Sequence, residues 1–249
     1  MDLQLLALLL VVVVLLVWRA ATRERREYAQ FKRLRATEAR QKVLRKWLIE
    51  SVLVMGGLAA AVLLAAWELV PRVLADVQAW PPIAGARHAF VESDFGPGLA
   101  VGLGIGLLAA LLVPILLMSR QQESNIPALG DVGALLPRTR AELPYGAGLS
   151  ISAGVFEELL FRLGMPALLF GIIPNGPLAF LIATLVFGAL HLYQKLTGVI
   201  TATVLGIIFA SVYVVSGSIV LVIVLHAIID LRALVLLPLV VGKVWSKTA

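Results

Sequence analysis

Charged and imidazole side chains interrupt the apolar C-terminal half of this chain at helical spacing. Glu158 and Arg162 are four residues apart, with the acid on the N-terminal side, and this order favours an ion pair along one helix face. Glu157 would point about 100° away from that face. The two adjacent glutamates are therefore expected to meet different partners.

Two further pairs repeat the four-residue spacing: Phe187 with His191, and His226 with Asp230. An ionised side chain costs about 2.5–3.5 kcal/mol at the centre of a bilayer, so such groups face one another or a polar cavity. We therefore expect Glu157 to converge with both histidines and Asp230. Together they could activate a water molecule, stabilise an oxyanion and move a proton, which are the requirements of peptide hydrolysis.

The composition of the chain determines which solvent its elements face. Of 249 residues, 60% are hydrophobic and 14% are charged, and the mean hydropathy is +0.97. These values exclude a water-soluble globule and indicate a multi-pass membrane protein. The chain has no cysteine, which excludes disulfides, thiolate nucleophiles and cysteine-ligated zinc.

Apolar runs long enough to cross a bilayer predict an all-α, polytopic transmembrane bundle of about seven spans. The runs are 3–18, 48–70, 98–118, 147–173, 178–193, 198–215 and 219–241. We divide the chain into an N-terminal transmembrane region (1–146), a core carrying the polar pairs (147–241) and a tail (242–249).

The segment 19–46 between the first two spans is strongly basic, with eleven Lys or Arg against three Glu. Such an excess is typical of a cytoplasmic loop, which predicts an outside N-terminus, a cytoplasmic C-terminus and residence in the cell (inner) membrane. The first run lacks the charge pattern of a signal peptide and is interpreted as a retained anchor. The spacing of Tyr28, Phe31 and Leu34 predicts an amphipathic helix on the membrane surface. The expected partners are membrane lipids, and no nucleic acid.

Glycines recur every four residues in the third span, at Gly98, Gly102 and Gly106, with Gly104 between them. No strand precedes them, so a phosphate-binding loop is a poorer explanation of these glycines than helix packing. Small residues at this spacing allow helices to approach closely in a membrane, and we expect such packing here.

The three polar motifs, taken in their order along the chain, resemble those of the CAAX protease and bacteriocin-processing family (CPBP, also called Abi). The motifs are Glu157-Glu158-x-x-x-Arg162, Phe187-x-x-x-His191 and His226-x-x-x-Asp230. The resemblance covers roughly residues 147–241. Members of this family are intramembrane proteases that act on membrane-anchored proteins or peptides.

The resemblance implies an all-helical fold with a catalytic cavity inside the membrane. Carried over by position, Glu157 is the base that activates water, His191 and His226 assist it, and Asp230 stands where some members have Asn. Glu158, Arg162 and Phe187 take supporting roles. An ionised Asp230 would accept a hydrogen bond from His226 and fix its tautomer, whereas a protonated Asp230 could donate one directly.

Other functions remain compatible with the same residues. Glu157, His191 and His226 could form a three-ligand zinc site, although no HExxH motif is present, and we favour catalysis by glutamate without a cofactor. A transporter could use the same acids and histidines as a proton relay. A membrane scaffold without activity would keep them only as a polar network.

Overall fold

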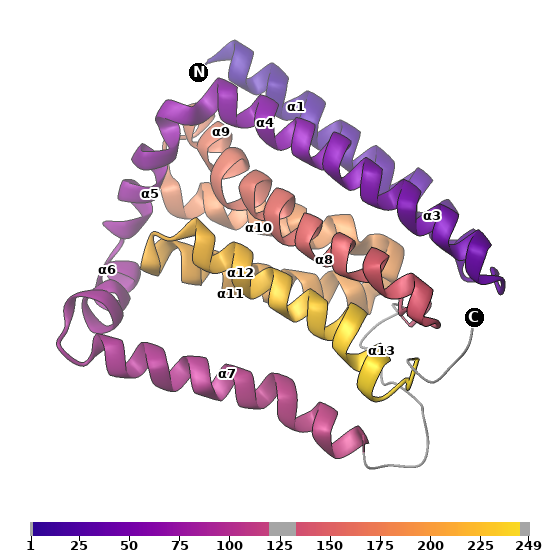
Figure 1. Ribbon diagram of the computed structural model, residues 1–249. Helices are drawn as coiled ribbons and strands as arrows, with labels where there is room; N and C mark the ends of the chain where they lie inside the picture. Colours follow the sequence, from indigo (N-terminus) through magenta and orange to yellow (C-terminus); the bar gives the residue numbers. More distant parts are fainter. Residues whose placement is uncertain (1, 120–132, 245–249) are drawn as a thin grey trace.

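The computed structural model describes residues 2–119 and 133–244, which form the helical bundle of Figure 1. Within these ranges the chain forms helices and turns and no strand. Most of the polar connection after the third span, and the last five residues of the predicted tail, fall outside the described residues. The predicted all-α class is confirmed for the part of the chain that the structure describes.

Among the residues that the structure describes, five helical stretches are long and apolar enough to cross a membrane: Leu3–Phe31, Thr37–Gln78, Gly96–Ser119, Gly176–Ser216 and Ile219–Val240. The fourth contains two helices, α10 (Gly176–Leu190) and α11 (Lys195–Ser216), which pack against each other. A further stretch, from Leu143 to Ile172, contains the charged motif and runs through the bundle. The seven predicted runs therefore correspond to seven long helical segments.

The first two spans extend beyond their apolar parts and form a long helical hairpin. Its segments are α1 (Leu3–Trp18), the π-helical turn η1 (Arg19–Glu24), α2 (Arg25–Phe31), α3 (Thr37–Glu50), the π-helical turn η2 (Ser51–Met55) and α4 (Gly56–Ala66). Arg23 of η1 pairs with Glu50 at the end of α3. The apolar face predicted to lie on the membrane surface instead packs inside the protein, because Tyr28 and Phe31 are buried against Leu44.

Short helices cross one end of the bundle and cap its long helices (Figure 1). They are η3 (Trp67–Leu69), α5 (Val70–Gln78), α6 (Pro81–Arg87) and η4 (His88–Glu92). Asp76 accepts a hydrogen bond from the first backbone N–H of α10, at Gly176, over 2.6 Å. Gln78 and Arg87 donate to the last carbonyls of α11, at Val214 and Val215. These contacts satisfy backbone groups that helix ends leave without partners.

Helix α7 (Gly96–Ser119) lies at the edge of the bundle (Figure 1). A side-chain carbon added at Gly98, Gly102, Gly104 or Gly106 would meet no atom of the described chain within 4 Å. The predicted close packing is therefore wrong within the part of the chain that the structure describes. Instead, Arg232 holds this helix by donating to the carbonyl of Leu111 at 2.7 Å.

The remaining helices form the core that carries the polar motifs. In chain order they are η5 (Arg140–Glu142), α8 (Leu143–Glu158), the π-helical turn η6 (Leu159–Gly164), α9 (Met165–Ile172), α10, the 3₁₀ turn η7 (His191–Gln194), α11, α12 (Ile219–Leu231), the π-helical turn η8 (Arg232–Leu236) and α13 (Leu237–Val240). Asn175 and Ser218 cap the starts of α10 and α12. The backbone reverses between α11 and α12 at Gly217, which adopts φ +72°.

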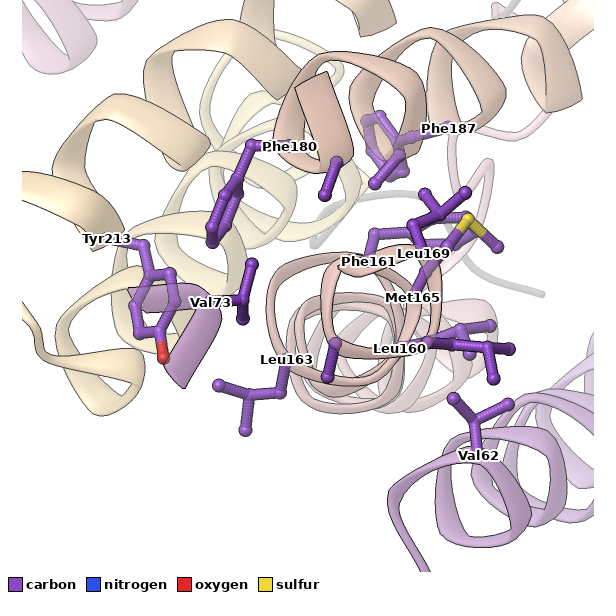
Figure 2. Packing of buried hydrophobic residues seen from close by; sticks show 14 of the residues in the cluster. Val62, Val73, Leu160, Phe161, Leu163, Met165, Leu169, Phe180, Phe187 and Tyr213 are labelled. Carbon is purple, nitrogen blue, oxygen red and sulfur yellow. The ribbon is translucent and has the colours of Figure 1, made fainter. Parts of the chain in front are cut away.

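The segment η6–α9 is the centre of the apolar packing. Figure 2 shows its side chains, among them Leu160, Phe161 and Met165, surrounded by residues of α4, α5, α10 and α11. Leu160 is fully buried and Phe161 is 1% exposed. The helix that carries the charged motif is thus enclosed by protein, which separates these charges from lipid.

Candidate active site

Helices α8 and α12 approach closely at the level of the charged motif. A side-chain carbon added at Gly154 would lie 2.9 Å from the backbone nitrogen of Ala227 and 3.1 Å from the carbonyl oxygen of Ile223. The absence of a side chain at Gly154 therefore allows the two backbones to meet. This contact places the end of α8 beside His226.

Glu158 is a buried carboxylate shared by two partners. Its Oε2 lies 3.1 Å from Nε of Arg162, so the ion pair predicted from the four-residue spacing is present. Its Oε1 accepts a hydrogen bond from Nδ1 of His226 at 2.6 Å. Both Glu158 and Arg162 are completely shielded from solvent. Sequence reasoning missed the contact with His226, because it depends on how α8 packs against α12.

Arg162 lies between aromatic rings. Its guanidinium carbon is 4.7 Å from the centre of the Phe187 ring and 5.8 Å from that of Phe209. Its terminal nitrogens have no hydrogen-bond partner among the described residues. The faces of aromatic rings attract cations, and this attraction together with Glu158 compensates the buried charge.

His226 is held on both sides. Its ring stacks on Phe209 with centres 4.9 Å apart and planes inclined by 23°. Its Nε2 lies 3.6 Å from Oδ2 of Asp230, which is too long for a hydrogen bond. The hydrogen bond expected from Asp230 is therefore not formed. Glu158 orients the imidazole instead, from the opposite nitrogen.

His191 follows the last residue of α10 and has a fixed orientation. Its Nδ1 donates a hydrogen bond to the carbonyl of Phe187 at 2.9 Å, since a carbonyl can only accept. In the neutral ring this leaves Nε2 unprotonated and able to accept. The rings of Phe187 and His191 are in contact, with centres 5.0 Å apart. Phe187 thus supports both His191 and Arg162.

The predicted residues meet at a cavity of about 520 Å³. Its lining includes Glu157, Phe187, His191, His226 and Asp230, but not Glu158 or Arg162. Glu157 is half-buried and faces the cavity, whereas Glu158 faces the protein interior. The structure thus separates the two glutamates as the helical geometry predicts, and it brings Glu157, both histidines and Asp230 to one space.

The N-terminal hairpin also contributes to the cavity wall, and sequence reasoning missed this contribution. Arg19, Arg23, Glu24 and Tyr28 line it from the first helix, and Trp47 lines it from α3. The charged residues among them carry no signal in the sequence beyond the basic character of the segment, and Tyr28 is marked only by its helical spacing with Phe31 and Leu34. Their position results from the uninterrupted continuation of the first span into η1 and α2.

The zinc alternative requires three donor atoms about 2.0–2.2 Å from one point. Across residues 2–119 and 133–244, no three His, Asp or Glu side chains are placed so that they could hold a metal ion. The Nδ1 atom of His226 is already bonded to Glu158, and its Nε2 faces Asp230. The residues in this arrangement do not fit the three-ligand site.

Residues 139–232 match a family model described as "Type II CAAX prenyl endopeptidase Rce1-like". The matched segment contains every residue of the three polar motifs. The match confirms the predicted resemblance to CAAX proteases for this segment, and it supports an intramembrane CAAX-type endopeptidase in general terms. Comparisons with curated proteins and with solved structures find no match.

Proposed function

We propose that this protein is an intramembrane endopeptidase of the CAAX type and that Glu157 activates the water that attacks the peptide bond. The observation that carries the proposal is the meeting of Glu157, His191, His226 and Asp230 at one cavity, within the segment that matches the family. A carboxylate facing a cavity beside two oriented imidazoles suits general base catalysis.

In the proposed reaction, the carboxylate of Glu157 accepts a proton from a water molecule in the cavity. The water oxygen attacks the carbonyl carbon, and the carbonyl oxygen becomes an oxyanion. A protonated histidine nitrogen facing the cavity donates a hydrogen bond to this oxyanion. Glu157 then passes its proton to the leaving nitrogen as the C–N bond breaks. One water is consumed, and a carboxylic acid and an amine are produced.

The residues behind His226 act through its position. Glu158 accepts from Nδ1, so Nε2 is directed away from Glu158 and toward Asp230 and the cavity. Phe209 restricts rotation of the ring by stacking. Arg162 keeps Glu158 in place by pairing with its second oxygen. We assign Glu158 and Arg162 as positioning residues, because neither lines the cavity.

The lining of the cavity supports a membrane-anchored protein or peptide as substrate. Leu16, Met55, Phe161 and Leu205 supply apolar surface suited to a lipid anchor or an apolar segment. Arg19 and Glu24 supply polar surface to the same cavity. The family description names prenyl endopeptidases, so a prenylated CAAX peptide is the first substrate to test. The basic segment 19–46 supports a cytoplasmic location for the hairpin end of the bundle.

The test uses the purified full chain in lipid vesicles with a farnesylated CAAX peptide and mass spectrometry of the products. We expect a new C-terminal fragment whose formation depends on the protein. A protein that leaves the peptide intact but moves protons across the vesicle membrane would support the transporter. A protein that does neither would support the scaffold, and both outcomes would contradict the proposal.

Chelation tests the absence of a metal requirement. Because the arranged residues do not fit a three-ligand zinc site, we expect activity to survive dialysis against a strong chelator. Metal analysis of the active protein should give well below one equivalent. Loss of activity on chelation, with recovery when zinc alone is returned, would contradict this prediction.

A further inference from the structure

The N-terminal helix brings an acidic side chain into the cavity from outside the segment that matches the family. In a π-helical turn, residues five apart lie on one face. The turn η1 therefore places Glu24 beside Arg19, with Oε1 of the glutamate 3.4 Å from Nη2 of the arginine. Both side chains line the cavity that holds Glu157 and His191.

The acids of this wall are not equally compensated. The carboxylate of Glu27 accepts hydrogen bonds from Arg23, Lys46 and the indole N–H of Trp47, with donor–acceptor distances between 2.7 and 2.9 Å. Glu24 has only Arg19 as an ion-pair partner among the described residues, and Arg19 also lies 3.8 Å from Glu50. Glu24 therefore has one cationic partner, which it shares with Glu50, whereas Glu27 receives three donors.

Glu24 lines the same cavity as the proposed reacting groups. Its side chain is 37% exposed, and it lines the cavity. It is near enough to Glu157 and His191 to interact electrostatically with both. Asp230 lines the same space, with 33% of its side chain exposed. The cavity that a substrate would enter is therefore lined by carboxylates of the N-terminal helix, α8 and α12, alongside the cations Arg19, Arg23 and Arg232.

We propose that Glu24 is a specificity-determining residue that binds a lysine or arginine side chain of the substrate close to the scissile bond. The inference rests on the proposed function. A substrate cation would supply the counter-charge that Arg19 provides only in part. A charged hydrogen bond formed inside such a cavity strengthens binding more than one in open solvent.

The experiment compares three farnesylated CAAX peptides that differ only at the residue before the prenylated cysteine, which is Lys, Gln or Glu. The full chain in vesicles should prefer the Lys peptide. Glu24→Gln should lower kcat/KM for the Lys peptide about tenfold more than it lowers kcat/KM for the Gln peptide, mainly through KM. Glu24→Lys should reverse the preference in favour of the Glu peptide.

Two variants provide the controls. Glu38→Gln removes the same charge from an exposed position on α3 outside the cavity, and the preference should stay that of the wild type. Arg19→Gln removes the protein partner of Glu24 and should increase the preference for the Lys peptide. If Glu24 only supports Arg19, then Glu24→Gln and Arg19→Gln will change kcat/KM by the same factor for all three peptides. That result would overturn this inference but not the proposed function. Failure of the wild type to cleave any of the peptides overturns the proposed function and this inference with it.

Discussion

At the scale of the residue, adjacent glutamates acquire different surroundings because one helical step turns a side chain by about 100°. Glu157 meets the cavity, and Glu158 meets Arg162 and His226 in the interior. The separation and the ion pair could both be predicted from spacing within one helix. The bond from Glu158 to His226 could not, because the two residues are 68 positions apart and meet only through the packing of α8 on α12.

Replacement of Glu158 tests its role as a positioning residue. Glu158→Gln leaves Arg162 buried without a carboxylate and replaces the acceptor of the His226 bond with a neutral amide. We expect a loss of about 3–5 kcal/mol in the free energy of unfolding, by analogy with broken buried pairs. A thermal midpoint below that of the wild type, measured on the purified protein in detergent, would show this destabilisation. A midpoint equal to that of the wild type would contradict the assigned role.

At the scale of the element, the position of His226 depends on the contact between α8 and α12. Gly154 permits that contact, yet nothing in the sequence distinguishes it from the other glycines of the chain. Gly98, Gly102 and Gly106 have the spacing of a packing motif and meet no neighbour, whereas Gly154 lies in a close helix contact. Spacing alone cannot tell which helix faces which neighbour, so the packing prediction was made for the wrong helix.

Substitution at Gly154 tests this contact. Gly154→Ala places a methyl group 2.9 Å from the backbone of Ala227, which must move α12 away from α8. We expect a longer separation of Glu158 from His226, a lower thermal midpoint and reduced activity. Gly57→Ala is the matched control, since its added methyl group meets no atom within 4 Å. Equal midpoints and activities for the two variants would remove Gly154 from this explanation.

At the scale of the whole molecule, a buried pair joins the N-terminal hairpin to the core that carries the polar motifs. Nε of Arg40 on α3 lies 3.0 and 3.1 Å from the two oxygens of Glu142, just before α8. Arg40 also donates to the carbonyls of Ala134 and Leu136 and lies over the ring of Phe31. The long helical segments could be predicted from hydropathy, but this contact could not, because Arg40 resembles the other bases of its segment in the sequence.

A double-mutant cycle measures this connection. Arg40→Met leaves Glu142 buried without its ion-pair partner, and we expect a loss of about 3–5 kcal/mol in the free energy of unfolding. The double variant Arg40→Met/Glu142→Leu removes both charges and should lose less than the sum of the two single variants. Thermal unfolding in detergent provides the four values. Additive losses would show that the two side chains act independently.

The central claim is that Glu157 is the base, and Glu157→Gln tests it most directly because glutamine keeps the shape and loses the carboxylate. The measurement is the rate of peptide cleavage in vesicles, together with the yield and thermal midpoint of the same preparation. We predict a wild-type midpoint and a rate lowered by roughly 10²–10⁴-fold, the usual contribution of a general base. Cleavage by Glu157→Gln at the wild-type rate would contradict the mechanism.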